Sequence, residues 1–256
     1  RHAADFAIWR KTPPGETRQM EWDSPWGRGA PGWHLECSVM GEAELGMPFD
    51  IHTGGIDHRE IHHPNEIAQN QAYHGCGSLD CAEHSGARMW MHNNFLIDRG
   101  GKMSKSSGEF LRLQLLVDRG YHPLAYRMMC LQAHYRSELE FSWEGLNATL
   151  TRLKRLVMTA TPVRDAAATE VADHRLTDLL AKFDAAMSDD LNTAVALTLV
   201  EEVAAMKKVD AGQKRSVLDT MDAVLGLQLL TVSRENLRVR PKAATIAEDD
   251  IEATLK

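Results

Sequence analysis

The chain has 256 residues and a net charge of −7, with 43% hydrophobic and 25% charged residues. This length allows one or two domains with a substantial core, and the composition is ordinary for a globular protein. The acidic balance argues against non-specific binding of polyanions, although it leaves room for a local basic groove. No apolar run is long enough to span a bilayer, and no signal-peptide pattern opens the chain, so we expect no membrane association.

The first part of the chain, to about Gly120, predicts an α/β arrangement. A short strand over 49–52 is expected to end in a glycine turn at Gly54 and Gly55. A helix is expected to follow, with His63 as its N-cap, and Gly75 to end it. A buried strand over 89–97 then leads into a loop rich in lysine and serine. This alternation of strand, helix and strand is typical of α/β folds.

From residue 111 onward, apolar residues recur at helical spacing and predict a helical bundle. Helices are expected over 113–135, 142–160, 175–209 and 213–230, the third interrupted at 188–190 by possible capping residues. Residues 160–172 are expected to be a linker or a weakly ordered connection. We expect the end of the chain, from Val232, to be irregular and frayed.

The four cysteines are too few to staple a chain of this length, and they suit a reducing, cytoplasmic compartment with thiols free or metal-bound. Cys76 and Cys81 have four residues between them, a weak metal pattern, and we assign them a structural role. Cys130 lies in an apolar helix and is expected in the core. Seven of the twelve histidines fall between His34 and His84, which directs attention to that region.

Cys37, His62 and Glu66 are candidate metal ligands. They offer a thiolate, an imidazole and a carboxylate, a plausible partial ligand set for zinc. His62 and Glu66 are four residues apart and therefore share one side of a helix start. The residues alone leave an alternative open, in which Cys37 is a small buried apolar residue and Glu66 only favours the positive helix end.

The segment "RGGKMSKSSGEF" is a candidate phosphate loop. Lys102 and Lys105 lie between glycines, and their ammonium groups suit a polyphosphate whose charge rises during transfer. The alternative is a solvated turn, the usual fate of this composition. The glycines of "HTGGID", Gly54 and Gly55, suit the close approach of a nucleoside at the carboxyl edge of a sheet. Together with the metal-like cluster, these segments favour catalysis.

These motifs also resemble a known family. "KMSKS", from Lys102 to Ser106, resembles the signature loop of class I aminoacyl-tRNA synthetases. "PGWHLECSVM", "FDIHTGGID", "HHPNEIAQ" and "HYRSELEFS" resemble cysteinyl-tRNA synthetases, and the similarity runs from about Asp5 to Leu199. The resemblance implies an α/β fold: part of a class I synthetase Rossmann-like catalytic domain followed by a mainly α-helical bundle.

The resemblance implies a role for each matching residue. Cys37, His62 and Glu66 would be three of four protein ligands of a Zn²⁺ ion that binds the thiolate of the substrate L-cysteine. Trp33 and His52 would line the amino-acid pocket, and Asp57 would lie beside the substrate's amino group. Lys105 would contact ATP, with Lys102 in support and Mg²⁺ accompanying the nucleotide. L-cysteine would be activated by ATP as an adenylate and transferred to tRNA(Cys), and zinc would select thiol over hydroxyl in one binding step.

By the same resemblance, residues 1–110 would be the C-terminal part of the catalytic nucleotide-binding domain, ending in the KMSKS loop. Residues 111–160 would be a helical connector and stem-contact region, and 161–256 a helical bundle of the tRNA-binding type. The chain departs from the family at Pro64, where a glutamate is usual. It also lacks the family's HIGH-type motif, the fourth zinc ligand and the anticodon-reading end, so we expect a fragment of a longer enzyme.

The sequence leaves two alternatives open. One is the related ligase that joins cysteine to a glucosaminyl-inositol in mycothiol synthesis, which shares the zinc pocket and the lysine loop. The other is a truncated, non-catalytic paralogue that binds metal or tRNA. Retention of Trp33, His52, Asp57 and Lys105 together argues against the second alternative. We expect a monomer.

Overall fold

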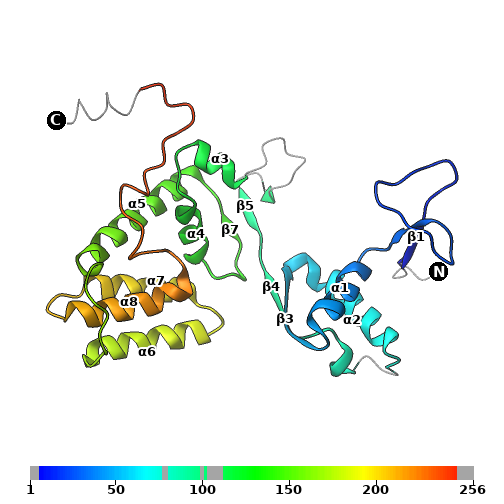
Figure 1. The fold of residues 1–256 in the computed structure, drawn as a ribbon, viewed down its shortest axis with the longest axis horizontal. Helices are drawn as coiled ribbons and strands as arrows, with labels where there is room; N and C mark the ends of the chain where they lie inside the picture. Colours follow the sequence, from blue (N-terminus) through cyan, green and yellow to red (C-terminus); the bar gives the residue numbers. More distant parts are fainter. Residues whose placement is uncertain (1–5, 77–79, 99–100, 103–111, 247–256) are drawn as a thin grey trace. The chain divides into compact units, whose positions relative to one another are not determined.

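The computed structural model describes residues 6–76, 80–98, 101–102 and 112–246. The chain divides into two compact units, Arg1–Asn94 and Phe95–Lys256, which we call unit 1 and unit 2. Each unit has its own elements, shown in Figure 1. Within the described ranges, no helix has both the length and the apolar character needed to cross a membrane.

Unit 1 contains two small sheets with helices between their strands. Its elements are β1 (Trp9–Lys11), β2 (Gly29–Pro31), α1 (Leu35–Leu45), β3 (Phe49–Gly55), the 3-10 helix η1 (Ile56–Arg59), α2 (His62–Tyr73), the 3-10 helix η2 (Ala82–His84) and β4 (Ala87–Asn93). β1 and β2 are antiparallel. β3 and β4 are parallel, in a register that runs from Phe49 opposite Ala87 to Gly55 opposite Asn93. The β3–α2–β4 crossover is the α/β pattern that the sequence predicted.

The predicted boundaries around this crossover are partly wrong. Gly54 and Gly55 belong to β3 and pair with β4, so the expected glycine turn is the end of a longer strand. α2 begins at His62, with Ile61 at its cap position. His63 is not the cap, because it is the second residue of the helix. Its ring is buried, and its Nδ1 lies 2.8 Å from His92 Nε2 of β4. Gly75, with a φ of 72°, follows the end of the helix as predicted.

Unit 2 combines a three-stranded sheet with a helical bundle. Its elements are β5 (Leu96–Asp98), β6 (Gly101–Lys102), α3 (Leu113–Asp118), α4 (Pro123–Leu131), β7 (Leu139–Glu140), α5 (Trp143–Ala160), the 3-10 helix η4 (Thr161–Val163), α6 (His174–Ser188), α7 (Thr193–Ala205) and α8 (Ala211–Leu225). β5 pairs with β6 in antiparallel and with β7 in parallel orientation. The single strand expected over 89–97 is therefore two strands, β4 and β5, in different units.

The helical prediction is confirmed for most of unit 2, with differences at the breaks. The expected helix over 113–135 is divided at Gly120, whose φ of 92° a helix does not permit, and Pro123 starts α4. The interruption after Ser188 is present, but Asn192 caps α7 by accepting from the Val195 N–H. Gly226 ends α8 in the left-handed conformation. Residues 232–246, the described part of the predicted irregular end, contain no helix or strand as expected, yet Leu237 is buried in the core, so this part is not frayed.

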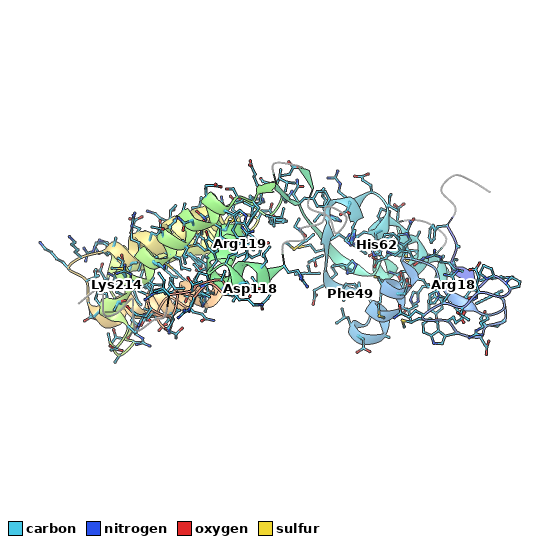
Figure 2. The ribbon with its side chains drawn as sticks, turned by 90° about the horizontal axis from the view of Figure 1, so that it is seen from above. Arg18, Phe49, His62, Asp118, Arg119 and Lys214 are labelled. Carbon is cyan, nitrogen blue, oxygen red and sulfur yellow. A yellow bond between two sulfur atoms is a disulfide. The ribbon has the colours of Figure 1, made fainter. Side chains whose placement is uncertain are left out.

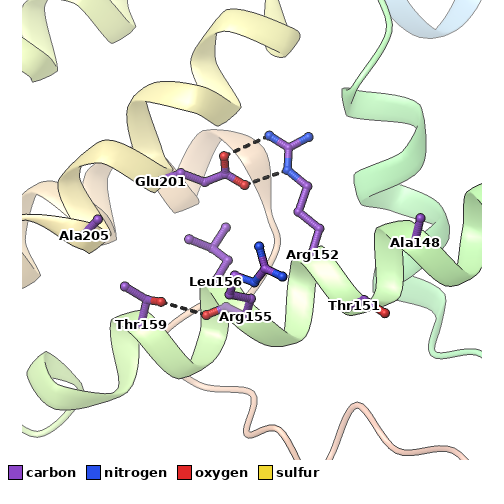
Figure 3. Close-up of a pocket in the computed structure, with 8 residues that line it drawn as sticks. All are labelled: Ala148, Thr151, Arg152, Arg155, Leu156, Thr159, Glu201 and Ala205. Atoms are coloured by element: carbon purple, nitrogen blue, oxygen red, sulfur yellow. Dashed lines mark hydrogen bonds and ion pairs between the residues drawn. The ribbon is translucent and has the colours of Figure 1, made fainter.

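The apolar faces of α4 to α8, the helices that Figure 1 draws as a bundle, pack into one hydrophobic core. Phe183, Leu197, Leu218 and Met221 are among its fully buried side chains. On the surface of the bundle, an ion pair also joins α5 and α7. Arg152 binds the carboxylate of Glu201 through two hydrogen bonds of 2.6 and 3.0 Å, as Figure 3 shows. Burial of apolar side chains therefore holds the helices together, and the ion pair adds a contact of defined geometry between α5 and α7 at the surface.

The segment 160–172 connects α5 to α6, as expected of a linker, but it is packed rather than weakly ordered. The Gln213 side chain on α8 accepts from the backbone N–H groups of Ala172 and Asp173, each at 2.8 Å. Ser216 binds Thr169 in both directions, accepting from its N–H and donating to its carbonyl. The backbone of the segment is therefore held against α8 by hydrogen bonds to the side chains of Gln213 and Ser216, which no local sequence pattern predicts.

The described part of unit 1 has a different interior. Its buried side chains are mostly polar: His34, Ser38, His62, His63, Glu66, Asn70 and Gln71. Among the described residues of this unit, Ala87 is the one buried hydrophobic residue. Because burying polar groups is costly unless they are paired, this interior points to a functional site.

Candidate metal and substrate site

The site is centred on Glu66, in the first turns of α2. His62 lies one helical turn before it, and its Nε2 is 2.7 Å from Glu66 Oε1. His52 reaches the same carboxylate from β3, with its Nε2 3.1 Å from Glu66 Oε2. Glu66 itself is 2% exposed. Two imidazoles therefore share one buried carboxylate, and His62, labelled in Figure 2, marks the place in unit 1.

Cys37 brings a thiol from α1 to this carboxylate. The ligand atoms of Cys37, His62 and Glu66 all lie within 4.8 Å of one another. His52, His63 and Glu66 satisfy the same criterion, so Glu66 belongs to two overlapping groups. Sulfur, nitrogen and oxygen donors in one half-buried cluster suit zinc, whose catalytic sites use three protein ligands and keep one position open. The donor set therefore fits a zinc ion.

Burial determines the protonation of these groups. It lowers the pKa of His62 to about 4, with neighbouring histidine rings adding to the effect. It lowers the pKa of His63 to about 3 for the same reasons. Burial also raises the pKa of Glu66 and of Cys37. The imidazoles of His62 and His63 are therefore neutral at pH 7 and present lone pairs, as metal coordination requires.

His34 supports the site in a way that the sequence did not reveal. It precedes α1 with a φ of 80°, a region that few residues other than glycine occupy. Its buried ring lies 2.7 Å from His62, Nδ1 to Nδ1, and 3.2 Å from Asn65. Such backbone strain persists where the surroundings fix the conformation, and here His34 orients His62. The histidine-rich composition between His34 and His84 was the one signal of this cluster in the sequence.

Gly54 allows β3 to lie close to the rings of His58 and His63, because it has no side chain. A Cβ at this position would lie 2.6 Å from His58 Nδ1 and 2.8 Å from His63 Cε1. The His63 ring packs against Trp90 at 4.7 Å between centroids, and its Nε2 is buried without a hydrogen-bond partner among the described residues. The glycine is therefore needed for packing against the histidines.

The other predicted site residues fall in different places. Trp33 is exposed, stacks on His34 with 5.4 Å between centroids, and lies 5.9 Å from the His62 ring. Asp57 is an exposed residue of η1. Lys105 lies outside the described residues. Lys102 is described only by its backbone, which ends β6.

Two expectations about cysteine are wrong. Cys76 and Cys81 are joined as a disulfide, whereas the composition predicted free or metal-bound thiols. Both lie after α2 and before η2. Cys130 lies on α4 as expected, but it is exposed rather than in the core.

Comparison with known proteins defines the class of protein to which the chain belongs. The family model for the catalytic domain of tRNA synthetases class I (C) matches residues 1–151. A solved ternary complex of LeuRS with tRNA and LeuAMS from Agrobacterium radiobacter K84 has a TM-score of 0.56 and 16% sequence identity. It covers 92% of this chain and 40% of that chain, and the likeness supports the class I fold alone.

Relatives with higher sequence identity indicate the family within this class. A cysteine–tRNA ligase from Novosphingobium aromaticivorans is 69% identical over the whole chain, which spans 52% of that relative. A cysteine–tRNA ligase from Zymomonas mobilis is 47% identical, again over the whole chain and 55% of that relative. The chain belongs to the cysteine–tRNA ligase family of class I aminoacyl-tRNA synthetases. It spans about half the length of these curated relatives.

Proposed function

We propose that the chain is the middle portion of a cysteine–tRNA ligase, which activates L-cysteine with ATP and transfers it to tRNA(Cys). The observation that carries this proposal is the convergence of Cys37, His62 and Glu66 within 4.8 Å. This cluster suits a Zn²⁺ ion, and it lies in a chain whose relatives are named cysteine–tRNA ligases. ATP use follows from the family, and Mg²⁺ is proposed as the companion of the nucleotide.

Cys37, His62 and Glu66 would hold the zinc, which supplies a soft Lewis acid with affinity for the thiolate of the substrate. His52 positions Glu66 through its 3.1 Å contact, and His34 positions His62. Because burial lowers the pKa of His62 and of His34, these two imidazoles are neutral and do not repel a metal cation. These residues together would distinguish cysteine from serine, which a plain pocket does only weakly.

Trp33 and Asp57 are proposed to bind the rest of the amino acid. The indole of Trp33 stacks on His34 and lies close to His62, so it can cover the side of the metal cluster. Asp57 sits on η1, directly after β3, where its carboxylate suits an ammonium group. Gly54 and Gly55 are proposed to let a nucleoside approach, and Lys102 and Lys105 to neutralise the phosphates of ATP.

The test is cysteine-dependent exchange between ATP and pyrophosphate, measured with the full-length protein. Cys37→Ala and Glu66→Gln are expected to lower zinc content and exchange together. Cys130→Ala, which changes a cysteine on α4 of unit 2, is the matched control and is expected to keep both. Exchange that is unaffected in Cys37→Ala would contradict the assigned site. Transfer of cysteine to a glucosaminyl-inositol rather than to tRNA would favour the mycothiol-pathway alternative.

A further inference from the structure

A second cluster of metal-type donors lies after the other end of α2. Cys76 follows Gly75, Cys81 directly precedes η2, and His84 ends it. The Sγ atoms of Cys76 and Cys81 are 3.3 and 3.2 Å from His84 Nδ1. All three donor atoms lie within 4.8 Å of one another. We propose that Cys76, Cys81 and His84 bind a second Zn²⁺ ion when the two thiols are reduced.

The backbone around these donors is held in place by Gln71, independently of the bond between the sulfurs. Gln71 is buried, and its carbonyl accepts from the Cys76 N–H at 2.9 Å. Its side-chain Nε2 donates to the Cys81 carbonyl at 3.1 Å. One residue of α2 therefore fixes both cysteines, and the His84 N–H binds the Cys81 carbonyl. A site whose donors are already positioned loses less conformational entropy when it binds an ion.

The ring of His84 is also oriented from its other side. It stacks on His74, with 4.5 Å between centroids and 13° between planes. His74 Nε2 in turn lies 3.0 Å from a carboxylate oxygen of Glu42 on α1. Side chains that fix the ring of a ligating histidine are a regular feature of protein metal sites. The arrangement directs Nδ1 of His84 towards the two sulfurs.

The donor set defines the class of ion. Two thiolates and one imidazole are soft to borderline ligands, which select Zn²⁺ over Mg²⁺ or Ca²⁺. Three protein donors leave one position for a water molecule. The proposed site is separate from that of Cys37, His62 and Glu66, because α2 has 12 residues and so spans about 18 Å between its ends.

Metal binding requires reduction of the disulfide that joins Cys76 and Cys81 in the structure. Two molecules of a thiol reductant such as glutathione give up two electrons and two protons and become a disulfide themselves. Cys76 and Cys81 are then released as thiols. Zn²⁺ displaces the two thiol protons to solvent as the metal–sulfur bonds form, with no further change of oxidation state. Cys76 and Cys81 thus form either a disulfide or, together with His84, the proposed metal site.

The experiment measures zinc per chain in the purified protein, reduced with a phosphine, loaded with Zn²⁺ and desalted. About two zinc ions per chain are expected for the parent protein, and about one for Cys81→Ser and for Cys37→Ser, each of which removes a thiolate ligand. Cys130→Ser is the matched control and is expected to keep both ions. Far-UV circular dichroism of every variant verifies that it is folded.

The outcomes separate this proposal from the proposed function. Equal zinc content in the parent protein and in folded Cys81→Ser would overturn the second site. Loss of zinc in Cys81→Ser but not in Cys37→Ser would support the second site and contradict the first.

Co²⁺ provides an independent readout. In Cys37→Ser, bound Co²⁺ is expected to give the charge-transfer absorption of two thiolates, and this band is expected to disappear on oxidation of the pair and in His84→Ala. An unchanged band in the oxidised protein would overturn the proposal.

Discussion

Gly54→Ala tests whether the histidine cluster depends on the close approach of β3. The added Cβ would lie 2.6 Å from His58 Nδ1 and 2.8 Å from His63 Cε1. The first distance is about 0.8 Å short of ordinary van der Waals contact, so a ring or the strand must move. His63 cannot yield easily, because it is 2% exposed, binds His92 at 2.8 Å and packs against Trp90.

The magnitude follows from these contacts. Overpacking by one methyl group costs about 1–3 kcal/mol when the neighbours cannot relax. His63 also packs against His52, at 4.7 Å between centroids, and His52 binds Glu66. A displaced His63 therefore disturbs the carboxylate that we assign to zinc. Changes to residues that support metal ligands lower metal affinity about 10- to 100-fold, and we expect a loss in this range.

The assay is urea unfolding followed by tryptophan fluorescence, since Trp143 alone of the six tryptophans lies outside unit 1. Zinc affinity is measured in parallel by competition with a chelator. Thr53→Ala, at an exposed neighbouring position of β3, is the control and is expected to change stability by less than about 0.5 kcal/mol. If Gly54→Ala unfolded at the same urea concentration as the control and bound zinc equally well, the reasoning would be refuted.

Three further predictions concern unit 2. Phe183→Ala empties a fully buried position of α6 and is expected to lower the free energy of unfolding by about 3–5 kcal/mol, measured by circular dichroism in urea. Hydrogen bonds from Arg175 lower the pKa of Asp173 to about 2, below its ordinary 3.8, so its stabilisation is present above pH 3.8 and is lost as the pH falls towards 2. Asp173→Asn is expected to remove this part of the pH dependence of unfolding, and an unchanged slope would contradict it. Glu201→Gln removes the charge that pairs with the half-exposed Arg152 and is expected to cost less than about 1 kcal/mol, with a smaller effect at high salt.

The sequence predicted best what depends on local pattern. α5 and α8 follow from apolar residues at helical spacing, and the break after Ser188 follows from polar residues that favour caps. The three donors of the proposed zinc site could be selected because thiol, imidazole and carboxylate are recognisable by type. Their convergence could not be seen in the pattern, because Cys37 and Glu66 lie on different helices.

What the sequence concealed depends on tertiary contact. His34 and His62 are 28 residues apart, so their 2.7 Å contact has no local signature. The glycines of β3 resembled a turn because glycine favours turns, whereas here a missing Cβ makes room for the rings of His58 and His63. The segment after α5 resembled a linker because its own residues carry no periodicity, while its partners Gln213 and Ser216 lie on α8.

The polar interior of unit 1 connects the two proposed metal sites to stability. Because its described residues bury little apolar surface, ions bound at the two proposed sites of the folded state would contribute a large share of its free energy of unfolding. At a free concentration 100 times Kd, one such ion contributes about 2.7 kcal/mol. Removing zinc with a chelator is therefore expected to lower the unfolding midpoint seen by the tryptophans of unit 1. The helices α4 to α8 contain no residue of either cluster, so their circular dichroism transition is expected to stay in place. No shift of the tryptophan transition would show that unit 1 does not depend on metal in this way, and a single transition that shifts as a whole would contradict the expected independence of α4 to α8.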